Sequence, residues 1–126
     1  RGQRLAKELD ADPYGLDEVA DLAPDVLINA TSVGMWPGVN ECPVPDGALR
    51  AGMVVFDSVY NPIRTELLKR AEAAGATVAS GVDWFVNQAA AQFELWTGQG
   101  APREVMRREL EHRLGKKDED AVAGEG

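Results

Sequence analysis

Apolar residues recur along the chain either at helical spacing or in short unbroken runs. Helical spacing predicts short helices over residues 1–9 and 16–22 and longer helices over 66–74, 82–96 and 102–114. Unbroken apolar runs that are too short for a helix predict three buried strands, at residues 26–28, 53–56 and 77–79. Helices therefore alternate with strands along most of the chain.

This alternation, with strands apolar throughout, is typical of a parallel sheet with helices on both faces. The predicted fold class is α/β, a partial doubly wound, Rossmann-like parallel sheet with flanking helices. Residues 31–47 are rich in glycine and proline and form a long loop between the first two strands. Three strands make about half of a nucleotide-binding sheet, so we expect the chain to be a fragment of a larger protein.

Local signals define the ends of several predicted elements. Thr65 is the expected N-cap of the helix after the second strand, and Gly75 is suited to the left-handed conformation that closes it. The helix over 82–96 is apolar on two sides and is expected to lie buried between two layers. Residues 1–114 form the expected domain, whereas residues 115–126 lack any apolar period and predict a disordered tail.

Composition and charge exclude several classes of function. The chain has 126 residues, 44% hydrophobic and 27% charged, with a formal net charge of -8, which disfavours binding to nucleic acid. One cysteine and one histidine exclude a disulfide framework, a cysteine-based zinc site and a histidine-rich metal site. No apolar run approaches the length of a membrane span, and no signal peptide is recognisable. We expect a cytoplasmic protein, and a first residue of Arg1 instead of methionine supports the fragment interpretation.

Candidate chemistry lies after the strands, because ligands of open α/β sheets bind beyond the carboxyl ends of the strands. The segments at these positions are residues 29–35, 57–60 and 80–81. Their small and hydrogen-bonding residues also suit ordinary loops and turns, so composition alone leaves both interpretations open. Gln88 is more informative, because an amide in a helix that is apolar on two sides must find partners.

Several common catalytic motifs are missing. The chain has no glycine-rich phosphate loop, Walker lysine, zincin motif or nucleophile elbow. Cys42 lies in a proline-rich loop without a nearby base, and His112 lies on a charged, solvated helix face. We therefore predict no catalytic residue and no metal ligand within this chain.

Three ordered motifs resemble one enzyme family. The motifs are NATSVGM at 29–35, DSVYNP at 57–62 followed by Thr65, Leu67 and Leu68, and GVDWFVNQAA at 81–90 followed by Phe93 and WTG at 96–98. Together they resemble the C-terminal half of shikimate dehydrogenase, over roughly residues 1–114. The resemblance implies a two-domain enzyme that uses NADP to interconvert 3-dehydroshikimate and shikimate in the route to chorismate and the aromatic amino acids.

The resemblance also implies roles for particular residues. Thr31, Ser32, Ser58 and Gly81 would contact the cofactor near its nicotinamide, and Arg1 would be the last piece of the site for its 2′-phosphate. Tyr60 and Gln88 would hydrogen-bond the substrate. The catalytic lysine and aspartate of the family, its substrate domain and its glycine loop have no counterpart in this chain. An isolated chain is therefore expected to be inactive.

The sequence is compatible with three alternatives. The chain could come from a quinate or quinate/shikimate dehydrogenase, or it could be a non-catalytic, Rossmann-like binding module. Its closing stretch, residues 92–106, also resembles bifunctional proteins that carry a 3-dehydroquinate dehydratase ahead of the dehydrogenase. Upstream sequence would discriminate among these possibilities, and the oligomeric state is not predicted.

Overall fold

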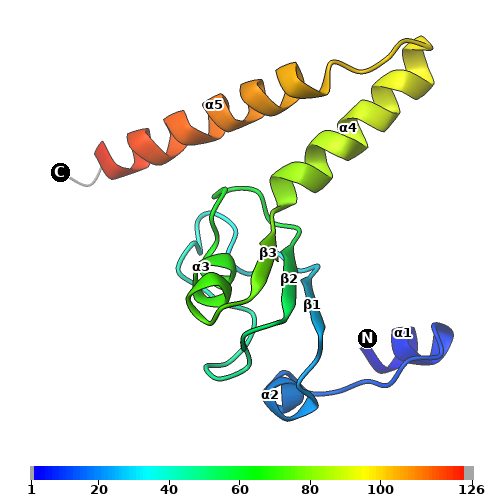
Figure 1. Cartoon of the computed structure of the whole chain (residues 1–126), viewed down its shortest axis with the longest axis vertical. Coiled ribbons are helices and arrows are strands. Elements are labelled where there is room, and N and C mark those ends of the chain that lie inside the picture. The colour runs from blue at the N-terminus through cyan, green and yellow to red at the C-terminus, as the bar shows by residue number, and fades with distance from the viewer. Residues whose placement is uncertain (1, 124–126) are drawn as a thin grey trace.

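A three-stranded parallel sheet lies at the centre of the structure (Figure 1). The computed structural model describes the backbone of residues 2–123 and the side chains of residues 2–115. The strands are β1 (Val26–Asn29), β2 (Val54–Asp57) and β3 (Thr77–Ala79), in the order β1-β2-β3. All three agree with the predicted apolar runs to within one residue at either end, so the pattern of the sequence placed the sheet correctly.

Helices occupy the predicted segments. They are α1 (Gly2–Glu8), the 3-10 turn η1 (Leu16–Glu18), α2 (Val19–Leu22), α3 (Glu66–Ala73), α4 (Gly81–Thr97) and α5 (Arg103–Ala123). The Thr65 hydroxyl accepts a hydrogen bond from the amide of Leu68 and so caps α3, as predicted. Gly75 follows α3 with a φ of 82°, the left-handed conformation expected of it.

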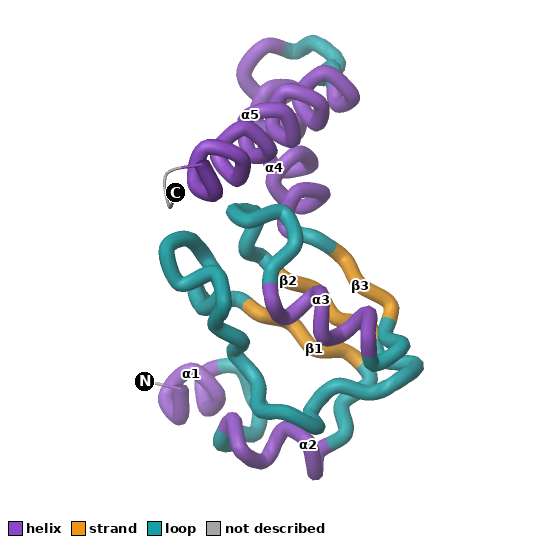
Figure 2. Tube along the Cα trace, turned by 90° about the vertical axis from the view of Figure 1, so that its left-hand side faces the viewer, coloured by secondary structure: helices purple, strands orange, loops and turns teal. Residues whose placement is uncertain are grey.

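One face of the sheet is covered by α3 and by the loop between β1 and β2 (Figure 2). Leu27 and Val55 point to this face from the two strands, and Leu67 of α3 packs against them with no exposed surface. The loop adds Val44 to the same cluster. Burying a side chain of this size stabilises a fold by about 1.5–3 kcal/mol, so this cluster is the main core.

The opposite face of the sheet is open among the described residues. Val26, Ile28 and Val54 point to it and are 56%, 62% and 41% exposed. Successive residues of a strand point to opposite faces, so an apolar run leaves an apolar surface on whichever face has no covering layer. The parallel α/β class is confirmed, but the expected helices on both faces are found here on one face only.

Helices α4 and α5 pack against each other beyond the carboxyl end of β3 (Figure 1). Val82 and Val86 of α4 meet Leu114 of α5 in a second apolar cluster. The other side of α4 is not buried, since Trp84 is 50% and Leu95 81% exposed. The expectation that α4 lies between two layers is therefore wrong for the described residues, because α5 covers it from one side alone.

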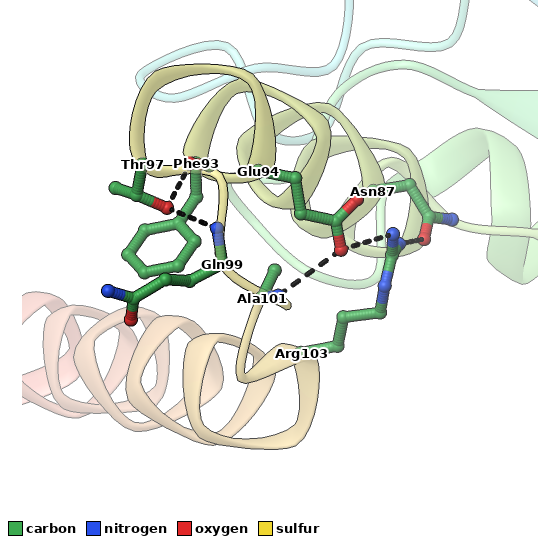
Figure 3. Close-up of polar contacts among 7 residues, drawn as sticks. All are labelled: Asn87, Phe93, Glu94, Thr97, Gln99, Ala101 and Arg103. Atoms are coloured by element: carbon green, nitrogen blue, oxygen red, sulfur yellow. Dashed lines mark hydrogen bonds and ion pairs between the residues drawn. The ribbon is translucent and has the colours of Figure 1, made fainter.

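Polar contacts hold the turn between α4 and α5 (Figure 3). The guanidinium of Arg103 donates to the amide oxygen of Asn87 at 2.9 Å and lies 3.3 Å from the carboxylate of Glu94. Glu94 also accepts from the amide of Ala101, at 3.2 Å. At the far end of the pair, Arg107 and Asp83 form an ion pair. These contacts fix α5 along the apolar side of α4.

The last helix extends beyond the point where a disordered tail was expected. Its backbone continues past Gly115 to Ala123, because lysine, glutamate and alanine favour the helix and each added residue extends an existing one at low cost. The side chains of 116–123 and all of 124–126 lie outside the described residues, so mobility of the segment stays a prediction. Among residues 2–123, no helix combines the length and apolarity needed to cross a membrane.

Candidate functional site at the carboxyl edge of the sheet

The carboxyl ends of the three strands bring the three candidate segments together. Asn29 and Asp57 are paired at the ends of β1 and β2, and the amide of Ser58 donates to the carbonyl of Asn29 at 3.0 Å. β3 ends at Ala79, two residues before α4 begins at Gly81. The parallel register thus gathers the segments after all three strands at one edge.

A buried carboxylate lies at the centre of this edge. Asp57 has no exposed surface, and its Oδ1 accepts from the side-chain amide of Asn29 at 2.9 Å and from the backbone amide of Val59 at 3.0 Å. Its Oδ2 accepts from the hydroxyl of Thr65 at 2.6 Å. One carboxylate therefore joins β1, the loop after β2 and the start of α3.

The side chain of Asn29 extends this network into the loop after β1. Its oxygen accepts from the backbone amide of Thr31 at 3.1 Å and from the Thr31 hydroxyl at 2.7 Å. Its amide nitrogen donates to the carbonyl of Val33 at 3.2 Å as well as to Asp57. Every donor and acceptor of this amide is used, so Asn29 determines the path of the loop.

Gly81 contacts protein backbone. A Cβ on this residue would lie 2.6 Å from the carbonyl oxygens of both Ser58 and Val59. Real Cβ atoms do not approach oxygen so closely, so only glycine lets the start of α4 pack against the loop after β2. The resemblance implies that Gly81 contacts the cofactor, and this cofactor contact remains a prediction. The contact present in the structure is with the backbone of Ser58 and Val59.

Tyr60 lies between this loop and α4. Its ring centroid is 4.7 Å from that of Phe85, with the planes tilted by 40°, and the ring also packs against the Val82–Val86–Leu114 cluster. Tyr60 is half-buried, and its hydroxyl makes no hydrogen bond to the described residues. Among the described residues, every buried side-chain nitrogen or oxygen has a hydrogen-bond partner. The Tyr60 hydroxyl has none, so it is not buried and is accessible to a ligand. The ring is fixed and its polar end is free.

The other predicted site residues differ in exposure. Thr31, Ser32 and Gln88 are exposed, Ser58 is half-buried, and Arg1 lies outside the described residues. The argument that Gln88 must satisfy a buried amide is therefore wrong here, because that side of α4 is uncovered. Exposure leaves its amide available to a ligand. Gln88 lies about two turns along α4 from Gly81, further from the strand ends than the other residues.

Sequence reasoning missed the residues that hold the edge together. Asn29 and Asp57 were included in the candidate segments 29–35 and 57–60 without a role of their own, and Thr65 was named as an N-cap and as part of a motif. A polar residue directly at the end of an apolar strand is the available signal, and Asn29 and Asp57 both show it. Their pairing across 28 positions depends on the strand register, which the sequence does not reveal.

Shifted pKa values arise from ion pairs on the helix surfaces. The hydrogen bond from Arg70 lowers the pKa of Glu66, and the same contact raises the pKa of Arg70. The hydrogen bond to Asp83 raises the pKa of Arg107. An arginine with a raised pKa does not release a proton in proteins, so these pairs have a structural role. Within the described residues, no three potential metal ligands among His, Cys, Asp and Glu side chains lie together.

Gly81→Ala is expected to destabilise the protein by about 1–3 kcal/mol, the usual cost of forcing an extra methyl group into a packed contact. The reason is the 2.6 Å approach to two carbonyl oxygens. Urea unfolding of the variant measures the change, with Gly100→Ala as the control because its Cβ would meet nothing within 4 Å. Equal unfolding midpoints for the two variants would contradict the close packing.

Comparison with known proteins identifies relatives for this arrangement. Residues 81–111 match the family model of the shikimate 5'-dehydrogenase C-terminal domain. A shikimate dehydrogenase (NADP(+)) from Natronomonas pharaonis is 48% identical over 117 residues, which cover 90% of this chain and 44% of that protein. A bifunctional 3-dehydroquinate dehydratase/shikimate dehydrogenase from Arabidopsis thaliana is 42% identical over 83% of this chain and 18% of its own length. The chain thus spans less than half of each relative.

Solved structures of the same kind share the fold. A shikimate dehydrogenase in complex with NADP+ superposes with a TM-score of 0.77 at 34% identity, covering 90% of this chain and 42% of that one. The Thermus thermophilus enzyme in complex with NADP(H) and shikimate has a TM-score of 0.76 at 29% identity, over 89% and 41%. A quinate dehydrogenase from Corynebacterium glutamicum in complex with NAD has a TM-score of 0.71 at 29% identity, over 85% and 39%.

Proposed function

Since this chain corresponds to the C-terminal part of the shikimate dehydrogenases, we propose that it provides part of the cofactor and substrate sites of an NADP-dependent enzyme that interconverts 3-dehydroshikimate and shikimate. The observation that supports this most strongly is the meeting of Ser58, Tyr60 and Gly81 at the carboxyl edge of the sheet. This edge is where open α/β sheets bind dinucleotides. We further propose that the chain acts as part of a protein about twice its length.

The donor set at this edge fits the nicotinamide end of a dinucleotide. A carboxamide needs both donors and acceptors, and the hydroxyls of the half-buried Ser58 and the exposed Ser32 supply both. The Thr31 hydroxyl, which donates to Asn29 and accepts from Val33, adds acceptor capacity alone. Gly81 brings the free backbone amides at the start of α4 next to the same loop. When bound, the nicotinamide supplies or accepts the hydride. Arg1, proposed for the 2′-phosphate, lies outside the described residues.

Tyr60 and Gln88 would orient the substrate. Shikimate is a polyhydroxylated carboxylate, and the free phenol and the exposed amide can each donate and accept hydrogen bonds. Packing against Phe85 fixes the ring of Tyr60 before any ligand arrives, which lowers the entropy lost on binding. What both side chains offer is directed hydrogen bonds, so the role proposed for them is orientation. Proton transfer falls to the lysine and aspartate that the resemblance places outside this chain.

A quinate dehydrogenase is the second candidate, supported by the similarity to the Corynebacterium glutamicum structure. Quinate and shikimate share the carboxylate and neighbouring hydroxyls that Tyr60 and Gln88 would contact, so this chain alone does not discriminate between them. The contacts that separate the two substrates would then lie in the rest of the protein.

Steady-state kinetics with four substrate pairs test the proposal. The full-length protein that contains this chain is assayed with shikimate or quinate and with NADP or NAD, by the absorbance of the reduced nicotinamide. We expect the highest kcat/KM with shikimate and NADP. A higher kcat/KM with quinate favours the second candidate, and a lack of reduction with all four pairs contradicts both.

A further inference from the structure

The resemblance assigns no role to Asp57, the acidic residue at the end of β2. It is fully buried, and all three groups that donate to it are neutral: the amide of Asn29, the backbone amide of Val59 and the hydroxyl of Thr65. Burying a carboxylate costs free energy because it loses its hydration. An apolar side chain of similar size at this position would avoid that cost. Its presence therefore calls for a reason beyond stability.

The hydrogen bonds of Asp57 lead to both proposed ligand-binding loops. Through Val59, the carboxylate fixes the backbone between Ser58 and Tyr60. Through Asn29, it fixes the loop that carries Thr31, whose backbone amide and hydroxyl both donate to the oxygen of the same Asn29 side chain. One carboxylate thus connects the residues proposed to contact the nicotinamide with the residue proposed to contact the substrate.

Asp57 itself is unable to touch either ligand. It has no exposed surface, and both of its oxygens are directed at protein donors. Thr65, also fully buried, is the residue that precedes α3, and its hydroxyl donates to the second oxygen at 2.6 Å. The carboxylate therefore has a fixed orientation, with Oδ2 bound to α3 and Oδ1 bound to the loops.

We propose that Asp57 is a positioning residue that sets the loops after β1 and β2 in register, so that the cofactor and the substrate are held in the geometry for hydride transfer. This inference rests on the proposed function. A misplacement of about 1 Å between reacting groups costs about a hundredfold in rate, so small movements of these loops are sufficient to lower activity.

Substitution of Asp57 by asparagine tests the proposal in the full-length protein. The new amide keeps one acceptor oxygen, and its nitrogen faces either the Thr65 hydroxyl, which must turn to accept, or one of the loop donors. In either case the negative charge that strengthens the hydrogen bonds to both loops is lost. We expect the KM for shikimate to rise and kcat to fall, so that kcat/KM decreases about ten- to a hundredfold. Loss of folded protein alone lowers the apparent kcat and leaves KM unchanged. Asp25→Asn, at a 97% exposed side chain that precedes β1 and so lies at the end of the strand opposite the two loops, is the matched control.

A pair of variants at Thr65 keeps the proposal falsifiable if Asp57→Asn does not fold. Thr65→Val removes the hydroxyl that orients Asp57 without changing the size of the side chain, and Thr65→Ser retains that hydroxyl. We expect Thr65→Val to raise the KM for shikimate and Thr65→Ser to restore it. An unchanged KM for shikimate in Thr65→Val, and in Asp57→Asn if that variant folds, overturns the positioning role. A wild-type protein that shows no shikimate-dependent reduction of NADP overturns the proposed function and this inference together.

Discussion

Tyr60→Phe and Gln88→Ala, each made in the full-length protein, are expected to raise the KM for shikimate about three- to a hundredfold. Losing one hydrogen bond costs about 0.5–1.5 kcal/mol, or about 1–3 kcal/mol if the partner is left unsatisfied, and about 1.4 kcal/mol corresponds to a factor of ten. The KM for NADP is expected to change far less, because the cofactor is held chiefly by other residues. Steady-state kinetics with each substrate varied separately measures both constants.

Matched controls for these variants come from the same chain. Tyr14→Phe removes a phenolic hydroxyl from an exposed position ahead of η1, and Gln99→Ala removes an exposed amide in the turn between α4 and α5 (Figure 3). Neither control is expected to change the KM for shikimate. A loss of NADP affinity in Tyr60→Phe or Gln88→Ala, with shikimate affinity intact, would mean that these residues contact the other ligand.

Leu67→Ala is expected to lower the free energy of unfolding by about 2–5 kcal/mol, the range for removing a large side chain from a packed core. Leu67 has no exposed surface and holds α3 on the sheet against Leu27, Met53 and Val55. Domains of ordinary size are stable by about 5–15 kcal/mol, so this loss would be a large share of the total. Denaturant unfolding of the variant and of the wild-type protein gives the difference.

Leu67→Met is the control at the same position, because it nearly conserves the volume of the side chain. We expect it to cost less than about 1.5 kcal/mol. A similar loss in the methionine and alanine variants would show that α3 tolerates no change at this position, and a small loss in both would show that the cluster around Leu67 is not the main core.

The elements of the fold were predictable because they follow from local pattern. A short unbroken apolar run such as 26–28 is a local signal for a strand of a parallel sheet, and all three predicted strands were found. Thr65 was predicted at the start of α3 and Gly75 at its end, and the structure places each residue at that position. Met106, Leu110 and Leu114 recur at helical spacing in the predicted helix over 102–114, and in the structure all three pack in the cluster between α5 and α4.

The layers around α4 and the sheet were not predictable in the same way. An apolar side chain such as Trp84 or Ile28 indicates a surface that is suited to burial, but it does not identify the segment that covers that surface. In the described residues neither is covered. The prediction of burial for Gln88 failed for this reason, since it assumed that both apolar sides of α4 had a neighbour.

The details of the candidate site depended on contacts between distant residues. The hydrogen bond between Asn29 and Asp57 spans 28 positions and exists only because β1 and β2 pair in parallel with these residues in register. The close approach of Gly81 to Ser58 and Val59 follows from the position of α4 after β3. The strand ends indicated where the site lies, whereas the tertiary structure was needed to show what holds it.

The most direct measurement of the central claim compares two purified proteins, the 126-residue chain and the full-length protein that contains it. Each is incubated with shikimate and NADP, and the absorbance of the reduced nicotinamide is followed. We expect shikimate-dependent reduction by the full-length protein and none by the chain alone, because the residues proposed for proton transfer lie outside it. Turnover by the isolated chain near that of the full-length protein would contradict this account.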